Sequence, residues 1–248
     1  MQFLTADQLK KDANNGLLHL KDIEVSSFRK DNECINFCIT RHDDLIQKHH
    51  LRGEFYEREE LSIISNAFEP GESFIDIGAN VGNHSVFVGK FLKPALILAF
   101  EPNPEAYNAL FANIVLNNLM DKFDFSGLGV GLSDERTDNA RMKVPTSNIG
   151  AARVVGSDGD IKLIRGDDIL IQRKVDFLKI DVEGLEIGVL SGLQKTIDAH
   201  RPKIFIEVNN ENRDAFFDFM ARESYTVKDK FKRYPANENF LIFPQEIE

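Results

Sequence analysis

The feature that most constrains the fold is an alternation of short apolar runs with helical patterns along the middle of the chain. The runs 73–78, 96–100, 175–181 and 203–208 are short, apolar and followed by glycine, charged or polar residues. The stretches between them carry apolar residues at spacings of three and four, the period of an amphipathic helix. Strands that alternate with helices in this way predict an α/β fold, a doubly wound and mainly parallel sheet.

Two further patterns extend this core at its ends. Residues 22–28 and 34–40 are β-rich and flank a short polar turn, which predicts an N-terminal hairpin, and residues 54–68 predict an amphipathic helix. Near the C-terminus, 225–227 and 240–243 predict strands joined by a polar segment without a helical stripe. We therefore expect this last pair to be antiparallel.

The segment 134–160 stands out from both patterns. It is polar, contains glycine and is weakly periodic, and it follows a predicted strand at 124–132. It is longer than a usual connection in a compact domain, so we interpret it as a candidate functional loop. No linker, repeat or shift of composition divides the chain. We expect one domain, in which 1–52 form an N-terminal extension of the main body, 53–248.

Charge and cysteine content limit the partners. The 248 residues include 40 acidic and 30 basic side chains, giving a net charge of −10 and a pI near 5.2, so attraction to nucleic acid or to anionic membranes is not expected. Cys34 and Cys38 are too few and too close for a disulfide framework and fit a reducing compartment. No apolar run approaches the ~18 residues of a membrane span, and the start lacks a signal-peptide core. These features predict a cytoplasmic protein and leave its oligomeric state open.

The first chemistry-bearing motif follows the first strand, at the edge where open α/β sheets bind ligands. It is the segment Asp76-Ile-Gly-Ala-Asn-Val-Gly-Asn-His84, in which Gly78 and Gly82 permit a tight turn before a helix. It resembles the dinucleotide fingerprint, but Asn80 and Asn83 stand where the second and third glycines belong. A ligand without a pyrophosphate would tolerate that change. The alternative is a glycine-rich turn that serves packing alone.

The second motif is Glu101, which ends the next strand 25 residues after Asp76. Nucleotide-binding folds place a ribose-binding carboxylate at a similar separation, about 20 residues. The two carboxylate oxygens can accept both ribose hydroxyls, and the turn Pro102-Asn103-Pro104 fixes the local geometry. The alternative is a helix-start carboxylate favoured by the macrodipole, which is compatible with ribose binding.

The third motif is a group of charged residues at the ends of the last two predicted parallel strands. Lys179 and Asp181 share one strand face, Glu183 starts a helix, and Glu207 closes the next strand. Such charges at the mouth of a sheet are costly unless they pair, hold a cation or touch a substrate. Asp181 and Glu207 are therefore candidate ligands for a divalent cation such as Mg²⁺ or Mn²⁺. A structural ion pair of Lys179 is the alternative.

Together these motifs resemble the FkbM-type S-adenosylmethionine-dependent methyltransferases. The matches keep the family's order and co-occur at the predicted strand ends, which makes them specific. The matching segments are Gly53–Glu57, Phe74–His84, Ala99–Pro104, Asn113 with Asn117, Leu132–Asp134, Asn148–Ala151, Phe177–Glu186 and Pro202–Glu207.

The resemblance implies a seven-stranded Rossmann-like methyltransferase sheet with an antiparallel last strand, and S-adenosylmethionine as the cofactor. It places the first turn at the methionine part of the cofactor, Glu101 at the ribose, and Leu132 and Ser133 beside the adenine, while Tyr56 and Glu57 close the pocket. The residues expected to bind the cofactor are Tyr56, Glu57, Asp76, Gly78, Asn80, Gly82, Glu101, Asn103, Leu132 and Ser133.

The implied reaction is O-methylation of a hydroxyl group on a small molecule, above all a sugar or glycan. It needs in-line positioning and a base. We expect Asp181 as the base, Lys179 to orient it or to polarise the acceptor, and His84 as the second choice of base, against a helix-surface or capping role. His49 and His50 are expected to be exposed loop residues. The alternatives are another small natural product as acceptor, an NAD(P)-dependent oxidoreductase, or a binding protein that keeps the fold without chemistry.

Overall fold

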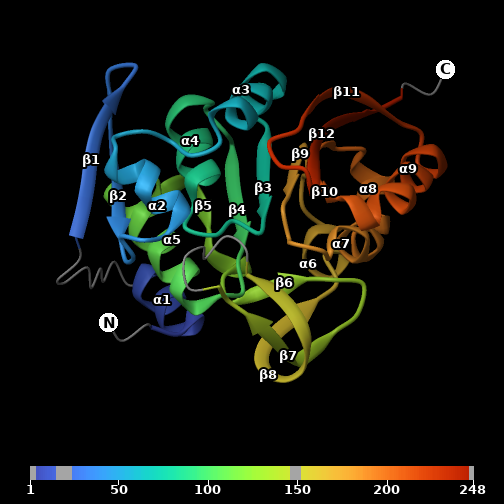
Figure 1. Ribbon diagram of the computed structural model, residues 1–248, viewed down its shortest axis with the longest axis horizontal. Coiled ribbons are helices and arrows are strands. Elements are labelled where there is room, and N and C mark those ends of the chain that lie inside the picture. Colours follow the sequence, from blue (N-terminus) through green and yellow to red (C-terminus); the bar gives the residue numbers. More distant parts are fainter. Residues whose placement is uncertain (1–3, 15–23, 146–151, 246–248) are drawn as a thin grey trace.

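The central element of the protein is a seven-stranded sheet, seen in a computed structural model that describes residues 4–14, 24–145 and 152–245 (Figure 1). The strand order is β11-β12-β10-β9-β3-β4-β5. Strand β12 runs antiparallel to both of its neighbours, and every other pair in this sheet is parallel. The predicted fold class is confirmed. The strands are β3 (Ser73–Ile77), β4 (Leu96–Phe100), β5 (Phe123–Asp124), β9 (Phe177–Ile180), β10 (Lys203–Asn209), β11 (Tyr225–Phe231) and β12 (Asn237–Pro244).

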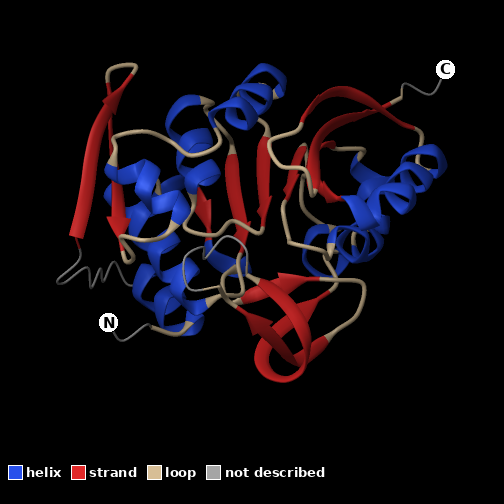
Figure 2. Ribbon diagram, in the orientation of Figure 1, coloured by secondary structure: helices blue, strands red, loops and turns tan. Residues whose placement is uncertain are grey.

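Helices cover both faces of this sheet (Figures 1 and 2). Successive strand residues point to opposite faces: Phe74 packs in one buried cluster, and Ile75 and Ile77 pack in the other. Because both faces are buried, the strands read as continuous apolar runs. One face carries α3 (Arg58–Ala67), α4 (Asn83–Phe91) and α5 (Pro104–Leu116), and the other carries α6 (Asp167–Leu170), α7 (Glu186–Gly192), α8 (Gln194–His200) and α9 (Arg213–Arg222).

The N-terminal extension contains the predicted hairpin. Strands β1 (Glu24–Lys30) and β2 (Glu33–Ile39) pair antiparallel through a two-residue turn, Asp31-Asn32, whose residues both have positive φ. The part of the predicted hairpin before Glu24 lies outside the described residues. The extension also contains helices α1 (Ala6–Asn14) and α2 (Leu45–Leu51).

A buried asparagine ties this hairpin to the main body. The Asn113 side chain, on α5, accepts the Cys38 N–H at 2.6 Å and donates to the Val81 carbonyl at 2.7 Å. Asn113 is fully buried. Strand β2 is thereby fixed to both α5 and the turn that precedes α4, and the extension packs as part of the same body.

A second, three-stranded sheet replaces the predicted functional loop. Its order is β6 (Val130–Leu132), β8 (Arg153–Ile164), β7 (Thr137–Lys143), so the prediction of a loop over 134–160 is wrong for the residues of β7 and β8. The segment still lines the cavity described below, through Met142, Ala152 and Val154. Most residues of β7 and β8 are partly or fully exposed, and exposed strands need no apolar alternation, which is why the sequence shows none. Residues 146–151, including the matching segment Asn148–Ala151, lie outside the described part.

The strand predicted at 124–132 is broken. It forms β5, a single 3₁₀ turn over Phe125–Gly127, and β6. A Cβ on Gly127 would lie 2.3 Å from the Ala99 carbonyl oxygen, so the chain turns where it passes close to β4. Within the described residues, we find no helix with the length and apolar content to cross a membrane.

Candidate active site

A cavity of about 460 Å³ opens at the carboxyl ends of β3, β4 and β9. This is the edge where open α/β sheets bind ligands. Its walls also include the segment before α3, part of the second sheet and the loop between β11 and β12. The residues of the sequence prediction that line it are Tyr56, Glu57, Gly78, Asn80, His84, Glu101, Leu132, Lys179, Asp181 and Glu207.

The turn after β3 is shaped by close packing. Gly78 has φ +78°, and a Cβ there would lie 1.8 Å from the Asp181 carbonyl oxygen. Gly82 has φ +84°, and its Cβ would lie 2.3 Å from Leu110. Close packing and positive φ therefore explain why both positions are glycine. The same close approach brings the turn and Asp181 to one cavity wall.

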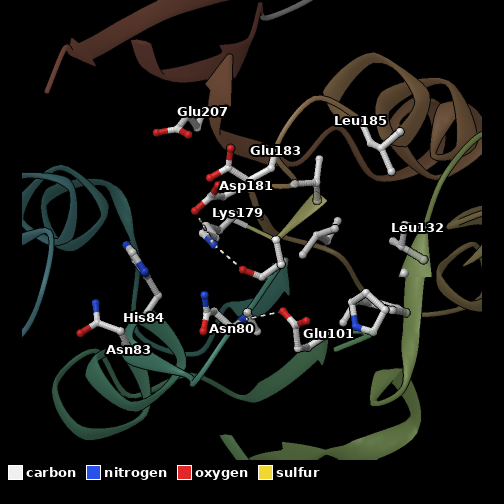
Figure 3. Close-up of a pocket in the computed structure, with 18 of the residues that line it drawn as sticks. Asn80, Asn83, His84, Glu101, Leu132, Lys179, Asp181, Glu183, Leu185 and Glu207 are labelled. Atoms are coloured by element: carbon white, nitrogen blue, oxygen red, sulfur yellow. Dashed lines mark hydrogen bonds and ion pairs between the residues drawn. The ribbon is translucent and has the colours of Figure 1, made fainter. Parts of the chain in front are cut away.

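Glu101 is buried at the end of β4 with both of its oxygens engaged. Oε2 accepts the Asn80 N–H at 2.8 Å (Figure 3), and Oε1 accepts the Asn103 N–H at 2.9 Å. Burial raises the pKa of Glu101 to about 7, although these two backbone bonds act in the opposite direction. Each carboxylate oxygen has a further lone pair. The carboxylate is thus fixed in orientation and still able to accept two hydroxyl donors.

Lys179 is the buried cation of the site. Its Nζ donates to the Gly78 carbonyl at 2.9 Å and lies 3.4 Å from both Asp76 Oδ1 and Asp181 Oδ2. Burial lowers its pKa, but the charges of Asp181 and Asp76 outweigh burial, so the pKa of Lys179 is raised. Lys179 stays protonated and pairs with both Asp76 and Asp181. That it orients Asp181 in the reaction stays a prediction.

Four residues expected at the cofactor lie outside the cavity lining. Asp76 is fully buried behind Lys179 and accepts the Ser85 hydroxyl at 2.7 Å. Asn103 accepts the Glu105 N–H at 3.1 Å and so caps α5. Gly82 and Ser133 are also absent from the lining. These four residues therefore lie behind the residues that line the cavity.

Three carboxylates gather on the opposite side of the cavity from Glu101 (Figure 3). Oxygens of Asp181, Glu183 and Glu207 all lie within 4.8 Å of one another. Burial, and then the charge of Asp181, raises the pKa of Glu183 to about 7 and that of Glu207 to about 9. The structure thus brings Asp181 and Glu207 together, as predicted, and places beside them Glu183, which the sequence analysis named in the same group of charges but did not propose as a cation ligand.

The histidines differ from their sequence-based descriptions. His84 is buried rather than on a helix surface, and its Nε2 accepts or donates no hydrogen bond among the described residues. Burial, and then the charge of Lys179, holds the pKa of His84 well below its usual range. The prediction that His49 and His50 are exposed loop residues is wrong, because both lie in α2 and His50 is fully buried, with its ring stacked on Phe37 at 3.6 Å.

The loop between β11 and β12 makes contacts that the sequence analysis did not predict. The Tyr234 hydroxyl lies 3.0 Å from that of Tyr56, 178 positions away in the chain. Arg233 pairs with Glu59 and with the buried Glu60 at the start of α3. No local pattern marks contacts over such separations.

The sheet order, the antiparallel β12 and the cavity at the strand ends define a Rossmann-like methyltransferase domain. Residues 76–230 match the methyltransferase FkbM domain. Because this match covers more than half of the chain, the chain belongs to the FkbM methyltransferase domain family, and the family prediction is confirmed.

Individual relatives are distant. The hexuronic acid methyltransferase AglP of Haloferax volcanii is 28% identical over 156 residues, which cover 60% of this chain and 60% of that protein. Methyltransferase sdnD of Sordaria araneosa is 28% identical over 163 residues, covering 51% of this chain and 62% of its own length. The chain therefore spans about 60% of the length of these curated relatives.

The crystal structure of a methyltransferase FkbM from Methylobacillus flagellatus has the same fold. It superposes with a TM-score of 0.50 at 20% identity and covers 70% of this chain and 44% of its own. At that identity the likeness concerns the fold alone.

Proposed function

We propose that this protein transfers the methyl group of S-adenosylmethionine to a hydroxyl oxygen, with a sugar or glycan as the acceptor. The observation that carries the proposal is the buried Glu101 carboxylate, which lines the cavity and is fixed by two backbone N–H groups. Its position at the end of β4 suits the two ribose hydroxyls of a nucleoside. Membership of the FkbM family supports methyl transfer as the reaction.

The cavity fits such a cofactor in size and in chemistry. A volume of about 460 Å³ lies within the roughly 300–1,000 Å³ of small-molecule sites. Phe100, Leu132 and Leu163 give an apolar wall next to Glu101 for the adenine, and the turn from Gly78 to Asn80 would hold the methionine part. When bound, S-adenosylmethionine supplies an electrophilic methyl group on a positively charged sulfur.

The other half of the cavity supports a hydroxyl acceptor. Glu57, Asp181 and Glu207 offer carboxylate oxygens, and a polyol offers hydroxyl donors to match them. Tyr56 and Tyr234 add aromatic surface at the same mouth. The relative AglP is a hexuronic acid methyltransferase, and a hexuronic acid is a sugar, so this relative favours a carbohydrate over other natural products as the acceptor.

The remaining sequence-based expectations stay predictions. They are a cytoplasmic location, no nucleic-acid or membrane partner, and a divalent cation at Asp181 and Glu207. The comparisons give no support for the cation. Loss of activity on chelation, with recovery in Mg²⁺ or Mn²⁺, would establish it; unchanged activity would leave the carboxylates to share protons instead.

The proposed function is tested by titration calorimetry followed by methyl transfer. We expect binding of S-adenosylmethionine and S-adenosylhomocysteine but not of NADH or NADPH, and transfer of a radiolabelled methyl group to a hydroxyl of a neutral or uronic sugar. Binding of a nicotinamide nucleotide alone would favour the oxidoreductase. Tight cofactor binding with no transfer to any of a broad glycan panel would favour a binding protein.

A further inference from the structure

Two short segments far apart in the chain are locked together beside the cavity. The Asn83 side chain accepts the Tyr56 N–H at 3.0 Å and donates to the Tyr56 carbonyl at 3.0 Å. His50 Nε2 lies 3.1 Å from the same Asn83 oxygen. Both polar backbone groups of Tyr56 are thereby fixed. The residues that follow each partner, Glu57 and His84, then face each other, with Glu57 Oε2 3.8 Å from His84 Nε2.

Glu57 has a backbone conformation that L-residues avoid. Its φ and ψ are 57° and 49°, in the left-handed region, and it is the N-cap of α3. A polar side chain at an N-cap commonly accepts an N–H of the first helical turn. The Glu57 side chain forms no such bond and lines the cavity instead. Strain of this kind is kept where the surrounding structure enforces it, and it is concentrated at functional sites.

The Glu57 carboxylate accepts no hydrogen bond from any described residue, and of its neighbours Glu183 and Glu207 accept none either. Asp181 is paired with the Lys179 ammonium, and Glu101 accepts two backbone N–H groups. Glu207 belongs to the group of three crowded carboxylates. The nearest basic group to Glu57 is His84, and because that buried imidazole is neutral it does not neutralise the carboxylate. Outside the crowded group, Glu57 is therefore the lining carboxylate with neither an N–H donor nor a cation paired to it among the described residues, and its oxygens are open to the proton of a ligand.

We propose that Glu57 is the catalytic base that takes the proton of the acceptor hydroxyl, with Asn83 as the positioning residue. This inference rests on the proposed O-methyl transfer and moves the base from Asp181, the choice from sequence, to a residue that the sequence analysis assigned to the cofactor. In the step, the acceptor oxygen bonds to the methyl carbon, the S–CH₃ bond breaks with its electron pair left on sulfur, and the hydroxyl proton passes to Glu57.

The charges around Glu57 fit this task. Burial, and then Asp181 and Glu60, raises the pKa of Glu57 to about 8, while Lys179 and Arg233 act in the opposite direction. The further titratable groups that face it are His84 and Glu207. Glu57 thus holds a proton near neutral pH in the free protein. A cationic ligand in the cavity lowers its pKa and releases that proton, whereas the uncharged thioether product lets Glu57 keep the proton it has taken.

The test compares two ligands that differ by the methyl group and its charge. S-adenosylmethionine and S-adenosylhomocysteine are titrated calorimetrically into the protein at pH 7.5, in two buffers of different ionisation enthalpy, which reports the protons released. For the wild type we expect more protons to be released with S-adenosylmethionine than with S-adenosylhomocysteine. Glu57→Gln should lose most of this difference, and both affinities should stay within about threefold. Glu69→Gln, which removes an exposed carboxylate after the far end of α3, should behave as the wild type.

Turnover gives the second readout. With an acceptor that the wild type methylates, Glu57→Gln should reduce kcat by about 100-fold or more at unchanged cofactor affinity. Retained proton release or wild-type turnover in Glu57→Gln would overturn the assignment. A loss of more than tenfold in affinity for both ligands would show that Glu57 binds the cofactor, as the sequence analysis expected. If the wild type itself binds neither ligand, the proposed function fails instead.

Discussion

The carboxylates in the two halves of the cavity differ in their hydrogen bonding. On the side of β4, Glu101 is held by two backbone N–H groups and has one defined orientation. On the side of β9 and β10, Glu57, Glu183 and Glu207 accept no hydrogen bond from the described residues, and their pKa values are raised chiefly by burial. A carboxylate with one fixed orientation suits a cofactor, which is the same molecule in every turnover. Unpartnered carboxylates suit a ligand that brings its own donors and gives up a proton.

The largest expected effect tests the packing on which both halves depend. Gly78→Ala should lower the free energy of unfolding by about 3 kcal/mol or more, because the new Cβ would meet the Asp181 backbone as well as a left-handed φ. Gly71→Ala is the matched control, since Gly71 also has a positive φ, +93°, but has open space around its Cβ. It should cost only about 1–2 kcal/mol. Equal losses in urea unfolding would show that the close approach is unimportant.

The next effect separates the halves by chemistry. Asp181→Asn should reduce turnover by about 100-fold while S-adenosylhomocysteine affinity stays within about threefold, because the change removes the charge that offsets Lys179 and so weakens Glu57 as a base. Asp168→Asn breaks an exposed ion pair with Arg136 and serves as the control, with turnover expected to match the wild type. Full activity of Asp181→Asn would remove Asp181 from the reaction.

Glu101→Ala tests the cofactor half, where we expect the change in ligand affinity rather than in turnover. We expect S-adenosylmethionine binding to weaken by about 1–3 kcal/mol, since hydrogen bonds to a charged group are lost. Glu105→Ala removes a nearby carboxylate that pairs with Arg41 outside the cavity. The affinity of this variant for S-adenosylmethionine should equal that of the wild type. Calorimetry decides the matter: an unaltered affinity of Glu101→Ala would refute the ribose assignment.

A smaller effect is expected at the loop that borders the acceptor half. Arg233→Ala leaves the buried Glu60 carboxylate without its guanidinium, which should cost about 1–2 kcal/mol of stability after allowing for the partial exposure of Arg233. Arg233→Lys keeps the charge and should recover part of the loss. Identical melting temperatures for wild type and Arg233→Ala would mean that the loop is not anchored by this pair.

The last effect concerns pH. In the folded protein the pKa of Glu207 is raised from 4.5 to about 9, by burial first and then by Asp181. Between these two values the folded state binds more protons than the unfolded state, so the Glu207 contribution to stability falls as pH rises. We expect the decline in melting temperature from pH 6 to pH 9 to be shallower in Glu207→Gln than in the wild type. A parallel decline would contradict the raised pKa.

The same contrast explains what could be predicted from sequence. Strands β3, β4, β9 and β10 were predictable because burial on both faces leaves continuous apolar runs, and Glu101, Asp181 and Glu207 were found because they end those runs. The hairpin of β7 and β8 was missed because exposed strands carry no apolar pattern.

The acceptor half was harder to predict because it is assembled from distant segments. Asn83 holds Tyr56 across 27 positions, and Tyr234 reaches Tyr56 across 178. The resemblance carried by Gly53–Glu57 placed Glu57 beside the pocket, but nothing in the local sequence signals that its side chain leaves the helix uncapped. The position of such residues depends on tertiary contacts.

A crystal structure with S-adenosylhomocysteine would test the division of the cavity most directly. The account predicts both ribose hydroxyls within hydrogen-bond distance of Glu101, the adenine against Leu132 and Leu163, and the sulfur turned toward the half that holds Glu57 and Glu207. A nucleoside bound on the Glu207 side, with Glu101 free of the ribose, would contradict it.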